Sequence, residues 1–137
     1  MNTVKTALRI PRHLLGGMEE QGRREAPLEA CGYCAGRDGL VHEILYLRNV
    51  DQSAEHYSME PREQFAAVKM ARAKGLELLG VWHTHPASAA RMSQEDIRLA
   101  NDPNSIYLIL SLLTGDLKAF SVDEEKKVSE VPLEIVA

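Results

Sequence analysis

The stretch Gly80–Asp96 reads G-V-W-H-T-H-P-A-S-A-A-R-M-S-Q-E-D, and it decides how the rest of the chain must be arranged. It closes an apolar run over residues 76–82 that predicts a buried strand. His83 and His85 follow, and on an extended chain residues two apart point to the same face. Pro86 cannot donate to a strand ladder, so we expect the strand to stop there. Both imidazoles can therefore reach one metal ion.

An acidic residue at the end of the same stretch can complete a metal site. The pattern Ser93-Gln94-Glu95-Asp96 predicts a helix start with Ser93 as the N-cap, and the first turn of that helix faces back toward the strand end. Two imidazole nitrogens and the Asp96 carboxylate would leave a fourth position open for water, which is typical of a catalytic zinc site. Taken singly, each feature has another interpretation. The histidines are then ordinary polar residues near a loop, and the acids belong to a helix cap. The combination of His83, His85 and Asp96 across one short loop indicates the metal site.

Length, composition and charge limit the class of protein. The chain has 137 residues, which predicts one domain over residues 1–137. A net charge of −4 argues against non-specific binding to nucleic acid. No run approaches the ~20 apolar residues of a membrane span, and residues 1–12 lack the apolar core of a signal peptide. We therefore expect a cytoplasmic protein with no membrane or nucleic-acid partner, while the oligomeric state cannot be predicted from the sequence.

The two cysteines, Cys31 and Cys34, form a C-x-x-C pair. One such pair is half of a four-cysteine zinc site, and the chain has no second pair. A thioredoxin-like redox role would place the pair at a helix N-terminus after a strand. Here the surrounding residues predict a strand, on which residues three apart point to opposite faces. We interpret the cysteines as buried structural thiols rather than a redox pair.

Helices and strands are mixed along the chain, which predicts an α/β domain. A turn signal, Gly36-Arg37-Asp38-Gly39, predicts a hairpin whose second strand spans residues 40–47. A first helix should begin at Pro11 and end before Pro27. Two further helices are expected over residues 61–74 and 93–100. The strands are expected at residues 4–10, 30–35, 40–47, 76–82, 105–112, 117–122 and 128–136, with a possible short one at 56–59.

Hydrolysis at a metal centre also needs a general acid/base, and a carboxylate close to the metal can fill that role. The chain has many acids, so spacing alone does not select one. Glu29 is the best placed, because it enters the predicted strand at residues 30–35 and is followed by the small residues Ala30, Cys31 and Gly32. The alternative is a solvated acid at a strand entrance.

With P-L-E-A-C-G around Glu29, H-T-H-P at 83–86 and S-Q-E-D at 93–96, the chain resembles the JAMM or MPN-plus family of zinc isopeptidases. The resemblance implies that His83, His85 and Asp96 hold one zinc ion. It also implies that Glu29 is the general acid/base and that Ser93 helps to hold the oxyanion. The fold implied is a single-domain, three-layer α/β/α arrangement with a mixed, curved sheet flanked by helices, similar to cytidine deaminases.

The compactness of the chain narrows the resemblance to one part of that family. Members that cleave polyubiquitin carry insertions around the site, whereas this chain looks like the short prokaryotic members. Those are linked to small ubiquitin-like sulfur carriers that end in Gly-Gly. The resemblance therefore implies a zinc metallopeptidase or isopeptidase that hydrolyses a peptide or amide bond at the Gly-Gly tail of such a carrier.

Two other functions compete with this interpretation. One is a non-catalytic MPN-type scaffold, although family scaffolds typically lack a metal ligand and this chain keeps all of them. The other is a zinc deaminase, whose signature requires H-x-E and P-C-x-x-C. The H-T-H triplet has no glutamate, and the cysteine pair precedes the histidines, so the sequence argues against a deaminase.

Overall fold

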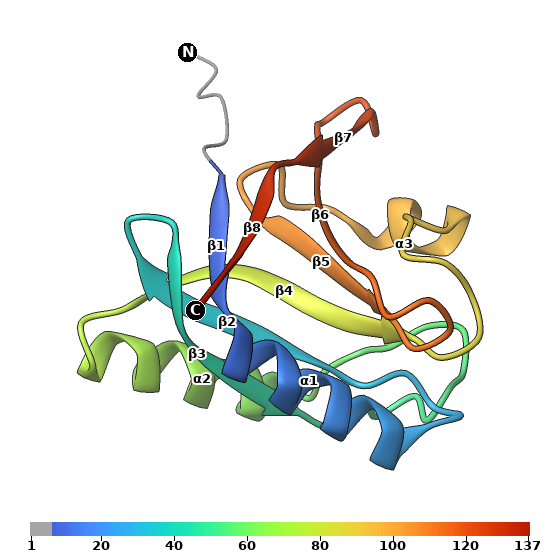
Figure 1. Ribbon diagram of the computed structural model, residues 1–137, viewed down its shortest axis with the longest axis horizontal. Coiled ribbons are helices and arrows are strands. Elements are labelled where there is room, and N and C mark those ends of the chain that lie inside the picture. The colour runs from blue at the N-terminus through green and yellow to red at the C-terminus, as the bar shows by residue number, and fades with distance from the viewer. Residues whose placement is uncertain (1–6) are drawn as a thin grey trace.

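An eight-stranded mixed sheet and three helices make up residues 7–137, the part of the chain that this computed structural model describes (Figure 1). The helices are α1 (Arg12–Glu25), α2 (Pro61–Ala73) and α3 (Gln94–Leu99). The strands are β1 (Leu8–Pro11), β2 (Cys31–Arg37), β3 (Leu40–Leu47), β4 (Glu77–His85), β5 (Ile106–Ser111), β6 (Leu117–Val122), β7 (Val128–Val131) and β8 (Leu133–Val136). Their order in the sheet is β7-β6-β5-β4-β2-β3-β1-β8.

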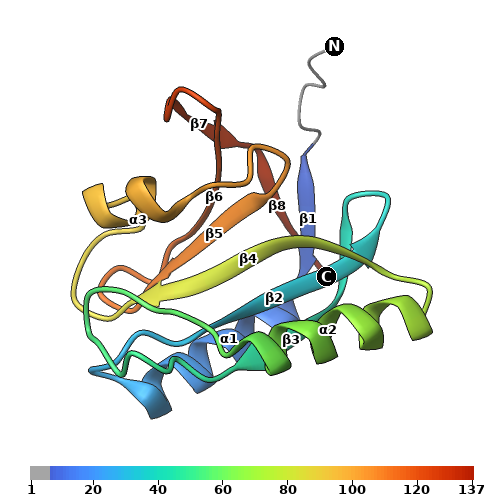
Figure 2. The same ribbon diagram turned by 180° about the vertical axis from the view of Figure 1, so that it is seen from behind.

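The helices cover both faces of the sheet, as the expected three-layer arrangement requires. Helix α1 buries Met18 in the largest core cluster, where it meets Trp82 of β4. Helix α2 packs Ala67 against the opposite face, where Val81 belongs to its cluster. Val81 also packs beside Ala100, the residue that follows α3, so α2 and α3 share that face. Figure 1 shows α1 in front of the sheet, and the reverse view in Figure 2 brings α2 to the front.

The sheet curls so strongly that its two edges approach each other. Strands β7 and β8 stand at opposite ends of the strand order, yet only Pro132 separates them in the sequence. The carbonyl of Pro132 accepts a hydrogen bond of 2.9 Å from the Leu8 backbone N–H, and Val131 and Leu8 share the largest core cluster. The prediction of one strand over residues 128–136 is therefore wrong. Pro132 has no N–H for a ladder, and the chain passes there from one edge of the sheet to the other.

Where local sequence signals were strong, the predicted elements are confirmed. Strands β2 and β3 form an antiparallel hairpin, and its turn residues Asp38 and Gly39 have φ angles of 53° and 76°. Positive φ at both central residues is the mark of a type I′ turn. Strand β4 ends at His85, immediately before Pro86, as expected.

Other predictions need correction. Pro11 ends β1 and caps α1, rather than being the first helical residue. Residues 56–59 form no strand, because Asn49 bonds the carbonyl of His56 and the N–H of Ser58. In α2, expected over residues 61–74, the buried residues are the small Ala67 and Ala71, whereas Phe65 is 65% exposed. The expected start of the first strand, residues 4–6, lies outside the described residues.

The two cysteines lie on opposite faces of β2, as the strand period predicted. Cys31 packs with Leu47 on the α2 face, and Cys34 packs with Trp82 on the α1 face. Both thiols are free and buried, and burial raises the pKa of each to about 12. A pair on opposite faces cannot share one metal ion, which supports their interpretation as structural thiols.

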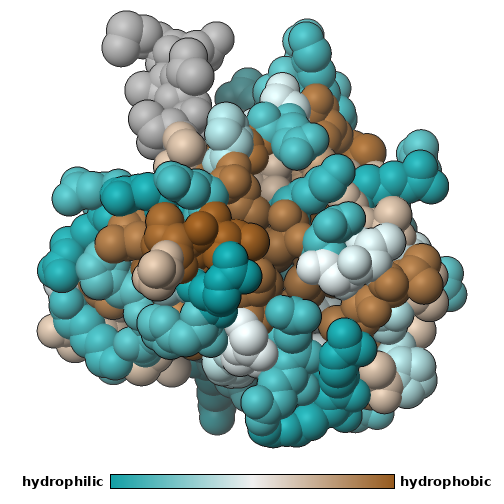
Figure 3. Space-filling view, viewed as in Figure 1, coloured by the Kyte–Doolittle hydropathy of each residue, from teal (hydrophilic) through white to brown (hydrophobic). Residues whose placement is uncertain are grey.

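Most of the large apolar side chains are inside the molecule. Figure 3 shows apolar surface in the middle of the face of Figure 1, where β1 and β8 run, framed by hydrophilic side chains. Ile135 of the edge strand β8 is 38% exposed. Among residues 7–137, no helix has the length and apolar character needed to cross a membrane.

A close approach of two strands at Gly32 seats the largest core side chain. Trp82 is fully buried, and its indole N–H donates to the carbonyl of Leu45 at 3.3 Å. Its ring meets Tyr46 edge-on, with centroids 5.6 Å apart. A Cβ at Gly32 would lie 1.8 Å from the Leu45 carbonyl oxygen and 2.7 Å from the indole nitrogen. Only glycine leaves room for this arrangement.

We therefore expect Gly32→Ala to lower the free energy of unfolding by about 2 kcal/mol or more, since the obstacle is largely backbone. Denaturant unfolding followed by circular dichroism measures the change. Gly16→Ala is the matched control: a Cβ there meets nothing within 4 Å. In the middle of α1 it should stabilise by roughly 0.5–1 kcal/mol. Equal stability of Gly32→Ala and the wild type would contradict this account of the core.

Candidate metal centre

The alternation of β4 sorts four consecutive residues between the two faces of the sheet. Trp82 and Thr84 point into the α1 face, and both are fully buried. His83 and His85 point to the face of α2 and α3, where they are 2% and 5% exposed. Both histidines lie inside the strand, and their ring nitrogens Nε2 are 3.2 Å apart. A regular strand thus holds the pair.

Glu29 reaches the same place from the segment that leads into β2. Thr84 joins this segment to β4: its hydroxyl accepts the Ala30 N–H at 2.8 Å, and its backbone N–H donates to the Ala30 carbonyl at 2.9 Å. The backbone N–H of Glu29 donates to the carbonyl of Ser53, and its carbonyl accepts from the side chain of Asn49. The Glu29 side chain is 2% exposed. The acid is therefore buried beside the histidines, and the alternative of a solvated acid is excluded.

Asp96 is brought in by the expected helix start. Ser93 caps α3: its hydroxyl accepts from the Asp96 N–H, and the Asp96 carboxylate accepts from the Ser93 N–H, both at 3.0 Å. This capping box turns the Asp96 side chain toward β4. Its carboxylate lies 2.9 Å from Nε2 of His85 and 3.2 Å from Nε2 of His83.

The side chains of His83, His85 and Asp96 bring several hydrogen-bond acceptors close together. There are too few N–H donors among them to pair every acceptor. Nδ1 of His85 lies 2.9 Å from the carbonyl of Ala89 and can only donate there, so the Nε2 of a neutral His85 is an acceptor. That nitrogen faces Nε2 of His83 and a carboxylate oxygen of Asp96. Positive charge at this point, from a metal ion or a proton, converts the repulsion into attraction. The donor set of nitrogen and carboxylate oxygen fits a metal such as zinc.

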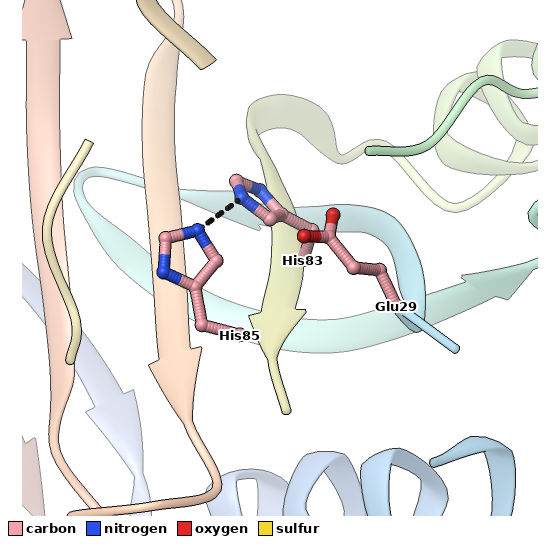
Figure 4. Close-up of side chains that lie close together, drawn as sticks. All are labelled: Glu29, His83 and His85. Atoms are coloured by element: carbon pink, nitrogen blue, oxygen red, sulfur yellow. Dashed lines mark hydrogen bonds between the residues drawn. The ribbon is translucent and has the colours of Figure 1, made fainter. Parts of the chain in front are cut away.

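Glu29 adds a fourth candidate ligand. One ligand atom each from Glu29, His83 and His85 lies within 4.8 Å of the other two, and all three residues are buried. Figure 4 shows these side chains converging from β4 and from the segment before β2. Among the described residues, Oε1 of Glu29 and Nδ1 of His83 are the buried side-chain polar atoms with no hydrogen-bond partner. These residues form a candidate metal site.

Burial and the neighbouring charges separate the proton affinities of the two carboxylates. Burial alone would raise the pKa of Asp96, but hydrogen bonds donated by His83 and by the protonated form of His85 hold it well below its usual range. Burial, followed by the charge of Asp96, raises the pKa of Glu29 from 4.5 to about 8. One carboxylate is thus fixed as an anion, and the other can carry a proton near neutral pH.

The two imidazoles are likewise separated. Burial lowers the pKa of His83 and outweighs its hydrogen bond to Asp96. Burial would also lower the pKa of His85, but its bonds to Asp96 and to the Ala89 carbonyl raise the value overall. Of the two imidazoles, His85 is therefore the one whose positively charged form its surroundings stabilise.

The candidate site opens to solvent on one side. An open cleft of about 500 Å³, called the cleft below, is lined by Glu29, His85, Ser93 and the loop before α2. A much smaller pocket of about 20 Å³, called the inner pocket below, is lined by His83 and Asp96 among others. A substrate can therefore approach Glu29 and Ser93 together through the cleft.

Sequence reasoning missed three residues that build this site. Thr84 could have been found, because its place between the two histidines sends it to the opposite face. Asn49 is 4% exposed and ties the loop to Glu29, and Tyr57 stacks on His83 with ring centroids 4.8 Å apart. Nothing local to Asn49 or Tyr57 in the sequence points to the metal site.

Three relatives are similar to this chain over more than 90% of its length. The chain is 35% identical to a probable TtuB-protein conjugate cleaving protease of Thermus thermophilus, covering 92% of this chain and 83% of the relative. It is 29% identical to a desampylase of Pyrococcus furiosus, covering 93% and 90%. It is 26% identical to a CysO-cysteine peptidase of Mycobacterium tuberculosis, also covering 93% and 90%.

A solved structure has the same fold as this chain. The solution structure of a protein from Desulfitobacterium hafniense is 40% identical and superimposes with a TM-score of 0.86, covering 94% of this chain and 92% of that one. Residues 11–123 match the family described as prokaryotic homologs of the JAB domain. This segment contains Glu29, the histidines of β4 and the capping box of α3. The chain therefore belongs to the prokaryotic JAB family, the JAMM type that its motifs indicated.

Proposed function

We propose that this protein is a zinc-dependent metallopeptidase that cuts a peptide or amide bond at the Gly-Gly tail of a small ubiquitin-like or sulfur-carrier protein. The observation that carries the proposal is the convergence of the buried side chains of His83, His85 and Asp96 beside Glu29, whose Oε1 is buried and has no hydrogen-bond partner among residues 7–137. The proposed setting is a single cytoplasmic domain over residues 1–137.

In this proposal His83, His85 and Asp96 hold one zinc ion, and Glu29 stays free for proton transfer. Asp96 is the better ligand of the two carboxylates, because its pKa is held low and its oxygens lie within 3.2 Å of both histidine nitrogens. Glu29 has the opposite property, a pKa of about 8. A bound zinc ion would supply a Lewis acid that polarises the scissile carbonyl and makes the attacking water more acidic.

In this proposal the two remaining tasks, proton transfer and stabilisation of the oxyanion, belong to Glu29 and Ser93 in the cleft. Glu29 accepts a proton from the attacking water and passes it to the leaving nitrogen, for which a pKa near the working pH is the best compromise. The oxygen of Ser93 already accepts the Asp96 N–H, so its own O–H is free to donate toward the carbonyl oxygen as charge develops there. The burial that raises the pKa of Glu29 also keeps bulk water away from it.

The proposed substrate follows from the shape of the cleft and from the family. Three relatives are called a desampylase, a CysO-cysteine peptidase and a probable TtuB-protein conjugate cleaving protease. Small side chains such as Ser53, Ala54 and Ser88 line the cleft together with Ser93. A glycine-rich tail, which has no side chains of its own, suits walls of this kind. The alternative of a non-catalytic scaffold gives no reason for an unpartnered, buried Glu29.

The first test concerns the metal. The purified protein should contain about one zinc ion, and His83→Ala or Asp96→Ala should lose most of it, since each removes one of three protein ligands. Binding should also weaken below pH ~6, where imidazole protonates. Elemental analysis of the purified wild type and variants measures their zinc content. Cys34→Ala, on the opposite face of the sheet, is the control and should retain zinc; a zinc-free wild type after expression with ample zinc would refute the site.

The second test separates an enzyme from a scaffold. Glu29→Gln should keep its zinc but cleave a Gly-Gly-extended carrier at least ~10²-fold more slowly, because general acid–base catalysis is lost. Ser93→Ala should cost a smaller factor, about tenfold, since one oxyanion donor is lost. Ser93→Thr retains both the hydroxyl and the helix cap and serves as the matched control. Cleavage by Glu29→Gln at the wild-type rate would show that another residue is the base.

The third test uses stability without metal. Between pH 4.5 and about 8 the unfolded chain has released the Glu29 proton that the folded protein retains, so stability falls as pH rises through this window. Glu29→Gln lacks this titration. In protein treated with a chelator, its stability advantage over the wild type should therefore grow by about 1–3 kcal/mol from pH 5 to pH 8. Urea unfolding at both pH values measures it; an advantage that shrinks with pH would contradict the raised pKa.

A further inference from the structure

The loop between β3 and α2, residues 48–60, forms one wall of the cleft and carries a histidine that the mechanism does not use. His56 lines the cleft together with Glu29, His85 and Ser93. It also lines the inner pocket, beside His83 and Asp96. The ring therefore stands where the two cavities meet, next to the groups proposed to do the chemistry.

One buried side chain fixes both this histidine and the proposed base. The amide nitrogen of Asn49 donates to the carbonyl of Glu29 at 3.1 Å and to the carbonyl of His56 at 3.0 Å. Its amide oxygen accepts from the N–H groups of Asp51 and Ser58, at 3.1 and 3.3 Å. The backbone positions of Glu29 and His56 are thus coupled through Asn49.

The orientation of the His56 ring is set by a carboxylate. Nδ1 lies 2.9 Å from Oδ2 of Asp51, and hydrogen bonds from Ser58 and His56 lower the pKa of that carboxyl. An ionised carboxylate can only accept, so Nδ1 carries the proton and the Nε2 of a neutral ring is an acceptor. Among the described residues Nε2 has no partner. A partly exposed ion pair contributes little to stability, so loop rigidity alone is a weak reason for it.

The rest of the cleft indicates which ligand would use this nitrogen. The charged side chains that line it, Glu29, Glu55 and Glu95, are all carboxylates, and no lysine or arginine of residues 7–137 joins them. Glu95 is paired with Arg98, whereas one oxygen of Glu29 is buried and unpartnered. The walls are rich in acceptors, and four of the uncharged side chains that line them are small: Ser53, Ala54, Ser88 and Ser93. A ligand that presents N–H groups and no side chains, such as an extended glycine peptide, matches them.

We propose that His56 is a specificity-determining residue whose Nε2, held in place by Asp51, accepts a hydrogen bond from a backbone N–H of the glycine tail in the cleft. This inference rests on the proposed function, because it names a contact made by that substrate. It assigns His56 to substrate binding and not to proton transfer, since Glu29 already serves the reacting atoms.

The test is a comparison of KM with kcat on a ubiquitin-like carrier extended by one residue beyond its Gly-Gly. His56→Ala should raise KM about 3- to 10-fold, the worth of one hydrogen bond, and leave kcat within about twofold. His56→Gln keeps an acceptor close to the position of Nε2 and should recover most of the loss. His42→Ala is the matched control, because His42 is exposed on β3 and bonds only the Leu40 carbonyl among the described residues. It should behave as the wild type.

A binding measurement keeps this inference separate from the proposed function. The affinity of a synthetic peptide amide that ends in Gly-Gly is measured by calorimetry for Glu29→Gln and for the double variant Glu29→Gln/His56→Ala. The double variant should bind 3- to 10-fold more weakly. If the wild type cleaves no carrier, the proposed function fails and the peptide affinities alone decide the role of His56. An unchanged KM and an unchanged affinity without the imidazole would overturn the inference while leaving the peptidase intact.

Discussion

The strict alternation of one strand is the constraint on which the site depends. In β4, Trp82 must enter the α1 face, where its ring lies over Gly32 and its N–H reaches the Leu45 carbonyl. Because successive side chains point to opposite faces, burying Trp82 sends His83 and His85 to the other face. Thr84 returns to the core side and bonds Ala30, which places Glu29 beside the histidines. A shift of one residue in register would bury the imidazoles in the apolar core and destroy the site.

The two carboxylates show how position alone gives one residue type two opposite properties. Asp96 lies at a helix start, takes an N–H from Ser93 and faces two imidazoles, all of which favour its charged form. Glu29 lies in a segment whose hydrogen bonds satisfy its backbone, while Oε1 of its buried side chain meets no donor in the described part of the chain. The pKa values of the pair are therefore pushed apart. This division is what permits one acid to remain a permanent anion while the other exchanges protons.

The sequence predicted those features that local chemistry determines. The I′ hairpin follows from Asp38-Gly39, and the start of α3 follows from the Ser93 capping box. The single strand predicted over residues 128–136 is split into β7 and β8, because the passage of the chain between the two sheet edges at Pro132 depends on tertiary contacts and not on local periodicity. The absent strand at residues 56–59 depends on Asn49, whose partners lie in a loop that no periodicity describes. The same holds for the site: the His83, His85 and Asp96 motif is local, whereas the loop that carries Asn49 and His56 is placed by tertiary contacts.

The passage of the chain from β7 to β8 has a consequence for the order in which the protein can fold on the ribosome. Strand β1 pairs with β8 along four residues, from Leu8 with Leu133 to Pro11 with Val136, but with β3 at only one. During synthesis β1 is made before the other strands of residues 7–137 and β8 after them, so β1 must wait for its main partner until the strands between them have been made. Contacts between such distant parts of a chain close slowly, because the entropy of a long loop is lost first. We therefore expect the hairpin β2–β3 and strand β4, which carry the proposed site, to assemble before the curled sheet is closed.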